Sequence, residues 1–209
     1  MKRLIVALLA ILLVAVSPAY AQTQDWVSLA KTVRDSIVEI ASANGACTGF
    51  IINSTAKNDK DNVDYVLTAA HCEGANLVAD LQPATIKAKD FKNDLMVLEI
   101  PNTDRTALKL ADKDAAVGEE VASYGYGYAL DQPMFRVAHV SAKDINIGER
   151  VQYQAIDSPF VKGQSGGPVV NSKGEVVLVV QLGSESVGFG VGAEKIQDRV
   201  GRYFEKVVK

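Results

Sequence analysis

From Val38 onward the sequence consists of short apolar runs separated by turn-forming residues. Short runs with Gly, Pro, Asn and Asp between them are typical of the strands of a β-barrel or a β-sandwich. The runs form two sets, at about 38–108 and about 117–193, with a polar stretch between them. Two sets around a polar linker favour a pair of small barrels over a single sandwich. After residue 193, apolar residues recur at helical spacing and predict a C-terminal amphipathic helix over 194–208.

The N-terminus has the pattern of an export signal. Two basic residues precede an apolar run over 4–16, and the small-residue cleavage pattern A-Y-A follows at 19–21. A membrane-spanning helix needs about 20 apolar residues, and Pro18 ends this run earlier. We therefore predict a signal peptide over 1–21 and one mature domain over 22–209. The mature protein is expected to be secreted or periplasmic, without a membrane anchor.

The chain has only two cysteines, Cys47 and Cys72, and only two histidines. An even cysteine count in an exported protein suggests a disulfide, with a pair of free buried thiols as the alternative. A metal site is less favoured because His139 lies far along the sequence from His71, and we expect neither a metal nor a cofactor. The formal net charge of −3 argues against nucleic acid and anionic membranes as partners, because both favour basic surfaces.

The sharpest local signal is the hexapeptide G-Q-S-G-G-P at 163–168. A serine hydroxyl needs a base before it can attack a carbonyl, and the oxyanion that results needs hydrogen-bond donors. Glycines let the backbone turn tightly, so that the amides of Gly163 and Ser165 can point into one concavity. The hexapeptide predicts Ser165 as a nucleophile with these two amides as its oxyanion hole. An ordinary glycine-rich turn is the alternative.

Two further segments can supply the partners that such a serine needs. His71 follows a predicted strand in T-A-A-H-C and is a candidate general base. Asp94 precedes an apolar strand in K-N-D-L-M-V-L and is a candidate acceptor for the imidazole N–H. Taken singly, His71 has a half-buried structural histidine as its alternative, and an aspartate before a strand is more often a turn former. Taken together, their order along the chain, His then Asp then Ser, is that of the chymotrypsin arrangement.

The segments T-A-A-H-C, D-L-M-V-L and G-Q-S-G-G-P resemble the three signature segments of the chymotrypsin/trypsin-like serine proteases. The resemblance implies an all-β fold of two antiparallel six-stranded β-barrels with a C-terminal α-helix. It also implies a catalytic triad of His71, Asp94 and Ser165 in the cleft between the barrels. In that family the cysteine of the strand before the histidine bonds to the cysteine after it. The resemblance therefore implies a disulfide between Cys47 and Cys72.

Within that superfamily the chain resembles bacterial HtrA-like proteases more than digestive enzymes. L-A-D at 110–112 and V-G-E-E-V at 117–121 resemble the stretch between the two barrels of HtrA proteases. V-G-F-G-V-G-A at 187–193 resembles their last barrel strand. Because little sequence follows that strand, we expect a protease domain without a PDZ domain.

Two positions depart from the animal trypsin-like enzymes. Gln164 stands where those enzymes carry the aspartate that pairs with a new N-terminal amine, so we expect no activation by that kind of cleavage. Pro159 stands where trypsin has its pocket-floor aspartate, and Asp157 is out of register by two residues. A small or medium apolar residue before the scissile bond is therefore favoured over Lys or Arg. The other predicted substrate-binding residues are Gln181, Leu182 and Gly183 on the strand that pairs with substrate, and Gly190 and Gly192 in the pocket.

The sequence as a whole predicts a serine endopeptidase that hydrolyses proteins or peptides through an acyl-enzyme. Two alternatives use the same fold: a non-catalytic binding module and an esterase with the same triad. Binding modules of this kind usually lack a triad residue, and none of the three is missing here. The remaining histidine, His139, is expected to be structural or surface-exposed. The physiological substrate and the oligomeric state are not predicted.

Overall fold

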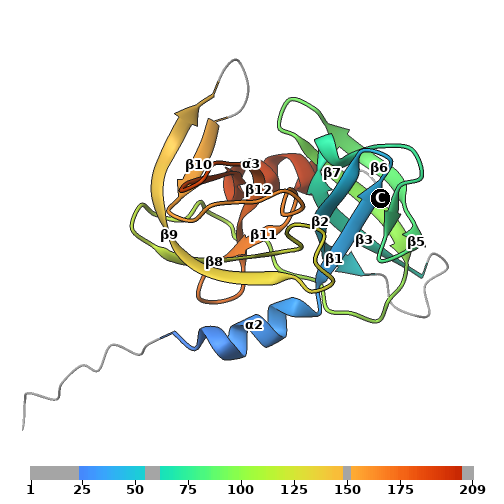
Figure 1. Ribbon diagram of the computed structural model, residues 1–209, viewed down its shortest axis with the longest axis horizontal. Helices are drawn as coiled ribbons and strands as arrows, with labels where there is room; N and C mark the ends of the chain where they lie inside the picture. The colour runs from blue at the N-terminus through green and yellow to red at the C-terminus, as the bar shows by residue number, and fades with distance from the viewer. Residues whose placement is uncertain (1–23, 55–61, 148–151, 204–209) are drawn as a thin grey trace, which may run out of the picture.

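The computed structural model describes residues 24–54, 62–147 and 152–203, and its elements are mainly β-strands. Figure 1 shows two lobes side by side, the first formed by strands β1 to β7 and the second by β8 to β13. The prediction of an all-β fold in two halves is confirmed. The predicted signal peptide over 1–21 lies outside the described residues.

The strands of the first half are β1 (Ile37–Ser42), β2 (Gly45–Ser54), β3 (Val63–Ala69), β4 (Val78–Ala79), β5 (Gln82–Pro83), β6 (Thr85–Asp90) and β7 (Leu95–Pro101). Those of the second half are β8 (Glu120–Gly125), β9 (Met134–Asn146), β10 (Gln152–Ile156), β11 (Pro168–Val170), β12 (Val176–Gly183) and β13 (Gly188–Gly192). The helical segments are α2 (Trp26–Arg34), a 3₁₀ turn (Ala70–Cys72), α3 (Ala193–Ile196) and a π-helical turn (Gln197–Gly201).

The second half is a closed barrel of six antiparallel strands in the order β10-β13-β12-β11-β8-β9. The first half is an antiparallel sheet of seven strands in the order β5-β4-β1-β2-β3-β7-β6, which curls without closing. It therefore differs from the predicted six-stranded barrel by one short strand. The extra strand arises because Asp80 and Leu81 both have positive φ, 46° and 65°, and make a two-residue turn between β4 and β5. Turns with positive φ at both central residues match the twist of a β-hairpin.

The two halves share a hydrophobic core because β7 is buried on both faces. Side chains alternate between the faces of a strand. Met96, Leu98 and Ile100 accordingly pack in the core of the first half. Leu95 and Val97 point the other way, into a cluster that also contains residues of the second barrel. The loops at the ends of β7 are thereby held against the second half.

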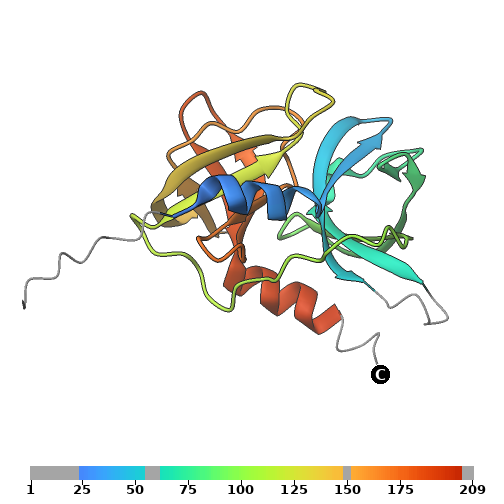
Figure 2. The same cartoon turned by 90° about the horizontal axis from the view of Figure 1, so that it is seen from below.

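Helices brace this arrangement at both ends of the described chain (Figure 2). Helix α2 begins at an N-cap, Asp25, whose carboxylate accepts a hydrogen bond from Ser28 N at 3.0 Å. At the other end, the helical segment that begins at α3 buries Ile196 and Val200 in the shared core. The helical segment spans 193–203 and so includes residues 194–203 of the predicted helix. Residues 204–208 lie outside the described residues. No helix within the described ranges is long and apolar enough to cross a membrane.

Candidate active site

His71 and Asp94 come together because of the pairing of two neighbouring strands. Ala69 at the end of β3 pairs with Leu95 at the start of β7, so the residues just beyond them lie at the same end of the sheet. His71 Nδ1 is 2.7 Å from Asp94 Oδ2, and the backbone N–H of His71 donates to Asp94 Oδ1 at 2.8 Å. Asp94 is buried, whereas His71 is exposed. The carboxylate thus fixes the imidazole through Nδ1 and leaves Nε2 for another partner.

Ser165 lies on the loop between β10 and β11 of the second half. It lines a cavity of about 340 Å³ together with His71, Gly163 and the two cysteines. The three predicted triad residues therefore meet at one place, although they are far apart in the sequence. Within the described ranges no hydrogen bond joins Ser165 to His71. In enzymes without bound substrate such catalytic hydrogen bonds are often long, and they tighten in the complex.

The predicted oxyanion hole is defined by the peptide between Lys162 and Gly163. The backbone N–H of Tyr128 donates to the carbonyl of Lys162 at 2.8 Å. In a trans peptide the C=O and N–H point in opposite directions, so the N–H of Gly163 points away from Tyr128. Across the described part of the chain, neither Gly163 N nor Ser165 N donates to a protein acceptor. Both amides are thus free to bind an oxyanion.

Gly163 and Gly166 are glycines for reasons of backbone geometry. Their φ angles, 98° and 82°, lie in the region that favours glycine. A Cβ on Gly166 would lie 2.3 Å from the carbonyl oxygen of Thr48 and 2.2 Å from Thr68 Oγ1. The nucleophile loop can therefore approach the first half this closely only with glycine at 166.

Cys47 and Cys72 form a disulfide with a Cα–Cα distance of 6.1 Å, which joins β2 to the turn that carries His71. This is the pairing that the resemblance implied. These two sulfurs and His71 also form the one group of metal-ligating side chains found among the described residues. The disulfide removes that group as a metal site, because metals bind the thiolate form of cysteine.

A second cavity, of about 580 Å³, lies beside the nucleophile loop and is lined by Pro159, Phe160 and Gly183. The Phe160 ring packs on Gly188, where an added Cβ would lie 2.5 Å from two ring carbons. Arg136 also lines the cavity, and its guanidinium donates to the carbonyl of Pro159 at 2.7 Å. An aromatic ring and a fixed cation therefore occupy the region where a specificity pocket was predicted.

The other predicted pocket residues are not all brought to this cavity. Gly192 lines a different cavity, beside Gln154 and the carboxylate of Asp114. Gly190 faces the backbone of Val179, where an added Cβ would lie 2.6 Å from the carbonyl oxygen. Close packing within the barrel thus explains both glycines. Leu182 is 43% exposed and free to contact a substrate.

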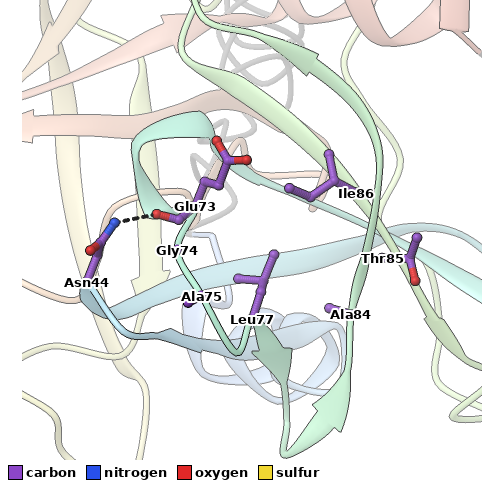
Figure 3. A pocket seen from close by; sticks show the side chains of 8 residues that line it. All are labelled: Asn44, Glu73, Gly74, Ala75, Leu77, Ala84, Thr85 and Ile86. Carbon is purple, nitrogen blue, oxygen red and sulfur yellow. Dashed lines mark hydrogen bonds between the residues drawn. The ribbon is translucent and has the colours of Figure 1, made fainter.

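The cavity drawn in Figure 3 is the largest described, about 740 Å³, but contains none of the predicted catalytic residues. It lies between the β1–β2 turn and strand β6, with Leu77 and Ile86 on its walls. Asn44 lines both this cavity and the one that holds Ser165, and its Nδ2 donates to the carbonyl of Glu73 at 2.7 Å. Two of the predicted catalytic residues, His71 and Ser165, instead line the smaller neighbouring cavity.

His139 is exposed, as predicted, and belongs to a separate pair with Asp157. The backbone N–H of His139 donates to Asp157 Oδ1 at 2.5 Å, and the imidazole Nδ1 lies 3.3 Å from Oδ2. The hydrogen bond from that N–H is the main cause that lowers the pKa of Asp157. The carboxylate of Asp157 is thus hydrogen-bonded to His139, and Asp157 does not line the cavity beside Pro159.

Sequence reasoning missed Thr48, Phe160 and Arg136 at this site. Thr48 follows Cys47, for which only the disulfide was predicted, and no role was predicted for the threonine side chain. Phe160 and Arg136 have no local pattern that separates them from other apolar and basic residues. Only the fold brings β9, which carries Arg136, next to the loop that carries Phe160.

Several curated relatives of the chain are serine proteases. Serine protease HTR4 from Rattus norvegicus is 26% identical over 186 residues, which cover 82% of this chain and 36% of the relative. Periplasmic serine endoprotease DegP from Salmonella typhimurium is 26% identical over 158 residues, which cover 68% of this chain and 33% of the relative. The chain thus spans about a third of the length of these relatives.

Solved structures share the fold. The active form of the Rv3671c protease from M. tuberculosis matches with a TM-score of 0.71 at 22% identity, over 84% of this chain and 83% of that one. The serine endoprotease from Yersinia pestis matches with a TM-score of 0.69 at 20% identity, over 85% of this chain and 65% of that one. The fold is therefore chymotrypsin-like. A family model described as a trypsin-like peptidase domain matches residues 47–177, which is more than half of the chain, and the chain belongs to that family.

Proposed function

We propose that this chain is a serine endopeptidase that uses His71, Asp94 and Ser165 to cleave peptide bonds through an acyl-enzyme. One observation carries the proposal: His71, which is bonded to the buried carboxylate of Asp94, lines a cavity together with Ser165 and Gly163. A structural Asp–His pair has no need of a serine opposite it, nor of free amides beside that serine. Family membership supports the same reading.

In the proposed mechanism His71 Nε2 takes the proton of Ser165 as its oxygen attacks the substrate carbonyl. Asp94 holds the imidazole in the tautomer with its proton on Nδ1 and stabilises the imidazolium that forms. The amides of Gly163 and Ser165 bind the oxyanion. His71 then gives its proton to the leaving amine, and water repeats the sequence on the acyl-enzyme.

The substrate is proposed to carry a small or medium apolar residue before the scissile bond. Phe160 lines the neighbouring cavity, where two cations, Arg136 and Lys162, outnumber the one carboxylate, Glu185. A Lys or Arg side chain would meet a net like charge there. Strict cleavage after basic residues in a peptide library would contradict this assignment.

Activation without trypsin-style processing is also part of the proposal. Gln164 is buried, and its Oε1 accepts the backbone N–H of Val161 at 3.0 Å. The side chain thereby holds the loop that leads to Gly163 without a new N-terminal amine. A purified form that begins near Gln22 should be active as isolated, and activity that appears only after cleavage near Val38 would contradict this.

Export to the periplasm or the cell exterior is proposed from the N-terminal pattern over 1–21. The DegP relative is described as periplasmic, which favours the same compartment. Sequencing the N-terminus of the mature protein from the periplasmic fraction and the medium tests this. The expected first residue is Gln22, and a mature protein that retains residues 1–21 would contradict it.

A fluorophosphonate probe tests the catalytic proposal most directly. Labelling is expected at Ser165 and should be absent in Ser165→Ala, whose kcat should fall by about 10⁶-fold. An unlabelled but folded wild-type protein would favour the non-catalytic binding module. Comparison of casein with simple ester substrates separates a peptidase from an esterase.

A further inference from the structure

Thr48 is a fully buried residue of β2 that reaches across the interface between the two halves. Its Oγ1 donates to the carbonyl of Gly163 at 2.7 Å and accepts the backbone N–H of Tyr126 at 2.9 Å. Its own backbone N–H donates to the carbonyl of Ser165 at 2.9 Å. One residue of the first half thus contacts both residues whose amides form the proposed oxyanion hole.

We propose that Thr48 is a positioning residue that holds the oxyanion hole in shape through its hydroxyl. This inference rests on the proposed serine-protease function and names a further residue on which that function depends. Thr48 touches no reacting atom. It acts on the backbone of the nucleophile loop, and its effect on chemistry is carried by the amides of Gly163 and Ser165.

The geometry of Gly163 explains why such a residue is needed. Glycine has little steric resistance to rotation of its flanking peptides. The peptide before Gly163 is held at the carbonyl of Lys162 by Tyr128 N, at 2.8 Å. The peptide after Gly163 is held at its own carbonyl by Thr48 Oγ1, at 2.7 Å. The bond to Lys162 fixes the peptide that carries the amide of Gly163. The bond from Thr48, together with the one from Gln164 N to the carbonyl of Val161 at 3.1 Å, fixes the next peptide. Gly163 is thus held through both of its flanking peptides, at the cavity that also contains Ser165.

A hydroxyl group is suited to this position because it both accepts and donates a hydrogen bond. The N–H of Tyr126 occupies the acceptor side of Thr48 Oγ1, so the hydroxyl proton is directed to the carbonyl of Gly163. Thr48 is 0% exposed, so solvent has no access to replace these bonds after substitution. A methyl group in place of the hydroxyl would remove the donor to the carbonyl of Gly163. The bond from Gln164 N to the carbonyl of Val161, at 3.1 Å, would then hold that peptide alone.

The decisive comparison is Thr48→Val against Thr48→Ser in the full chain. Valine keeps the shape but lacks the hydroxyl, whereas serine keeps the hydroxyl. We expect kcat of Thr48→Val to fall by about 10- to 100-fold, less than the loss on deleting an oxyanion-hole donor outright. KM should change by less than about threefold, and Thr48→Ser should recover most of kcat. If valine prevents folding, Thr48→Ala against Thr48→Ser isolates the same hydroxyl.

A second readout separates the oxyanion hole from general stability. A peptide aldehyde forms a tetrahedral adduct with Ser165 whose oxygen occupies the hole, whereas the same peptide with a methyl group in place of the aldehyde has no oxygen to place there. Thr48→Val should weaken the aldehyde by the same factor as kcat and leave the affinity for the methyl-terminated peptide unchanged. Equal weakening of both ligands, or of neither, would overturn the proposal.

Ser36→Ala is the control for Thr48→Ala, because Ser36 is also a fully buried hydroxyl residue, and its Oγ donates to the carbonyl of Thr106 at 2.5 Å, outside the nucleophile loop. It should lower the unfolding temperature but leave kcat within about threefold of wild type. An equal loss of kcat in Ser36→Ala and Thr48→Ala at equal stability would overturn the positioning role. Fluorophosphonate labelling of wild type at Ser165 is measured first. Its failure would refute the proposed function, whereas labelled wild type with fully active Thr48→Val would refute this inference alone.

Discussion

The side-chain amide of Gln181 donates to the carbonyl oxygen of Asp94 at 2.8 Å, across the interface between the two halves. Asp94 has a positive φ of 53°, which is uncommon for a residue with a side chain. Its carbonyl also accepts the N–H of Ala70 at 3.1 Å. Asp94 is thus held in an unusual backbone conformation by one donor from each half. Gln181 stands on the strand that is predicted to pair with the substrate backbone, and its side chain is buried and bonded to Asp94 of the proposed triad.

Replacing Gln181 should therefore weaken catalysis without weakening substrate binding. Gln181→Met keeps the length of the side chain but removes the donor, so Asp94 is held from the first half alone. We expect kcat to fall by about tenfold with KM nearly unchanged. The control is Gln154→Met, since Gln154 is also a buried glutamine but has no side-chain hydrogen-bond partner among the described residues. Equal kcat values in the two variants would contradict a role for Gln181.

Asp94→Asn should lower kcat by about 10⁴-fold. Asp94 Oδ1 and Oδ2 accept bonds from His71 N and Nδ1, and an amide side chain has only one acceptor oxygen for these two donors. The asparagine NH₂ group would then face Nδ1 and favour the tautomer with its proton on Nε2, which cannot act as a base. Steady-state kinetics on a peptide substrate measures this loss.

Asp157→Asn is the matched control for Asp94→Asn. Asp157 also accepts the backbone N–H of a histidine, His139, and faces its Nδ1, but neither residue lines the cavity that contains Ser165. We expect kcat within about twofold of wild type. A comparable loss in both variants would mean that the Asp94 effect arises from stability and not from catalysis.

Most strands could be predicted because their alternation and turn residues are local signals. Residues 95–100 were predicted as one strand, and β7 spans Leu95–Pro101. Strand β5 was missed because its turn, Asp80-Leu81, lacks the Asn-Gly or Asp-Gly pair that usually marks a two-residue hairpin turn. Leu81 is 87% exposed at this turn, so even its apolar character was misleading.

The residues of the site also form two groups, those that a local sequence signal marks and those that it does not. Ser165 and His71 stand in short motifs whose chemistry can be read directly from the sequence. Thr48, Gln181 and Phe160 act through contacts with residues far away in the chain, so no local pattern marks them. Gly192 was expected in the pocket because glycines commonly line one. It is instead explained by the carboxylate of Asp114 and the amide of Gln154, which occupy the space of a side chain.

Phe160→Ala should shift cleavage toward larger residues before the scissile bond. The ring lies against Gly188, and its removal would open space in the cavity beside Gly183. We expect kcat/KM for substrates with Phe or Leu at this position to rise relative to Ala by about tenfold or more. Profiling with a peptide library measures the change. An unaltered profile in the folded variant would show that this cavity does not receive that residue.

Removal of the disulfide should lower stability more than the loss of two ordinary side chains. The bond closes a loop with a sequence separation of 25 residues, which corresponds to about 3.5 kcal/mol of unfolding free energy in the chain-entropy model. Denaturant unfolding of the variant with Cys47→Ala and Cys72→Ala measures the loss. The control is reductant: it should destabilise wild type to the level of the double variant and leave the double variant unchanged. A wild type that is insensitive to reductant while unfolding would contradict the prediction.

Glu175 should make stability depend on pH in the acid range. Its Oε1 lies 2.6 Å from Lys109 Nζ and its Oε2 accepts a bond from Asn171 at 3.2 Å. The hydrogen bond from Lys109 is the main cause that lowers the pKa of Glu175, followed by the bond from Asn171. Because the pKa is lower in the folded than in the unfolded state, the unfolded chain binds more protons. Stability from this group is therefore full above about pH 5 and lost as the pH falls through the folded pKa.

The comparison of wild type with Glu175→Gln isolates this contribution. Wild type should be the more stable protein at about pH 6, and the difference should shrink toward about pH 3 as the carboxylate is protonated. Lys109→Met removes the main cause of the lowered pKa, so in that background Glu175→Gln should have a smaller effect at pH 6. Urea unfolding at several pH values measures all four proteins. A difference that stays constant or grows on acidification would contradict the assignment, because a carboxylate with a lowered pKa stabilises only while it is ionised.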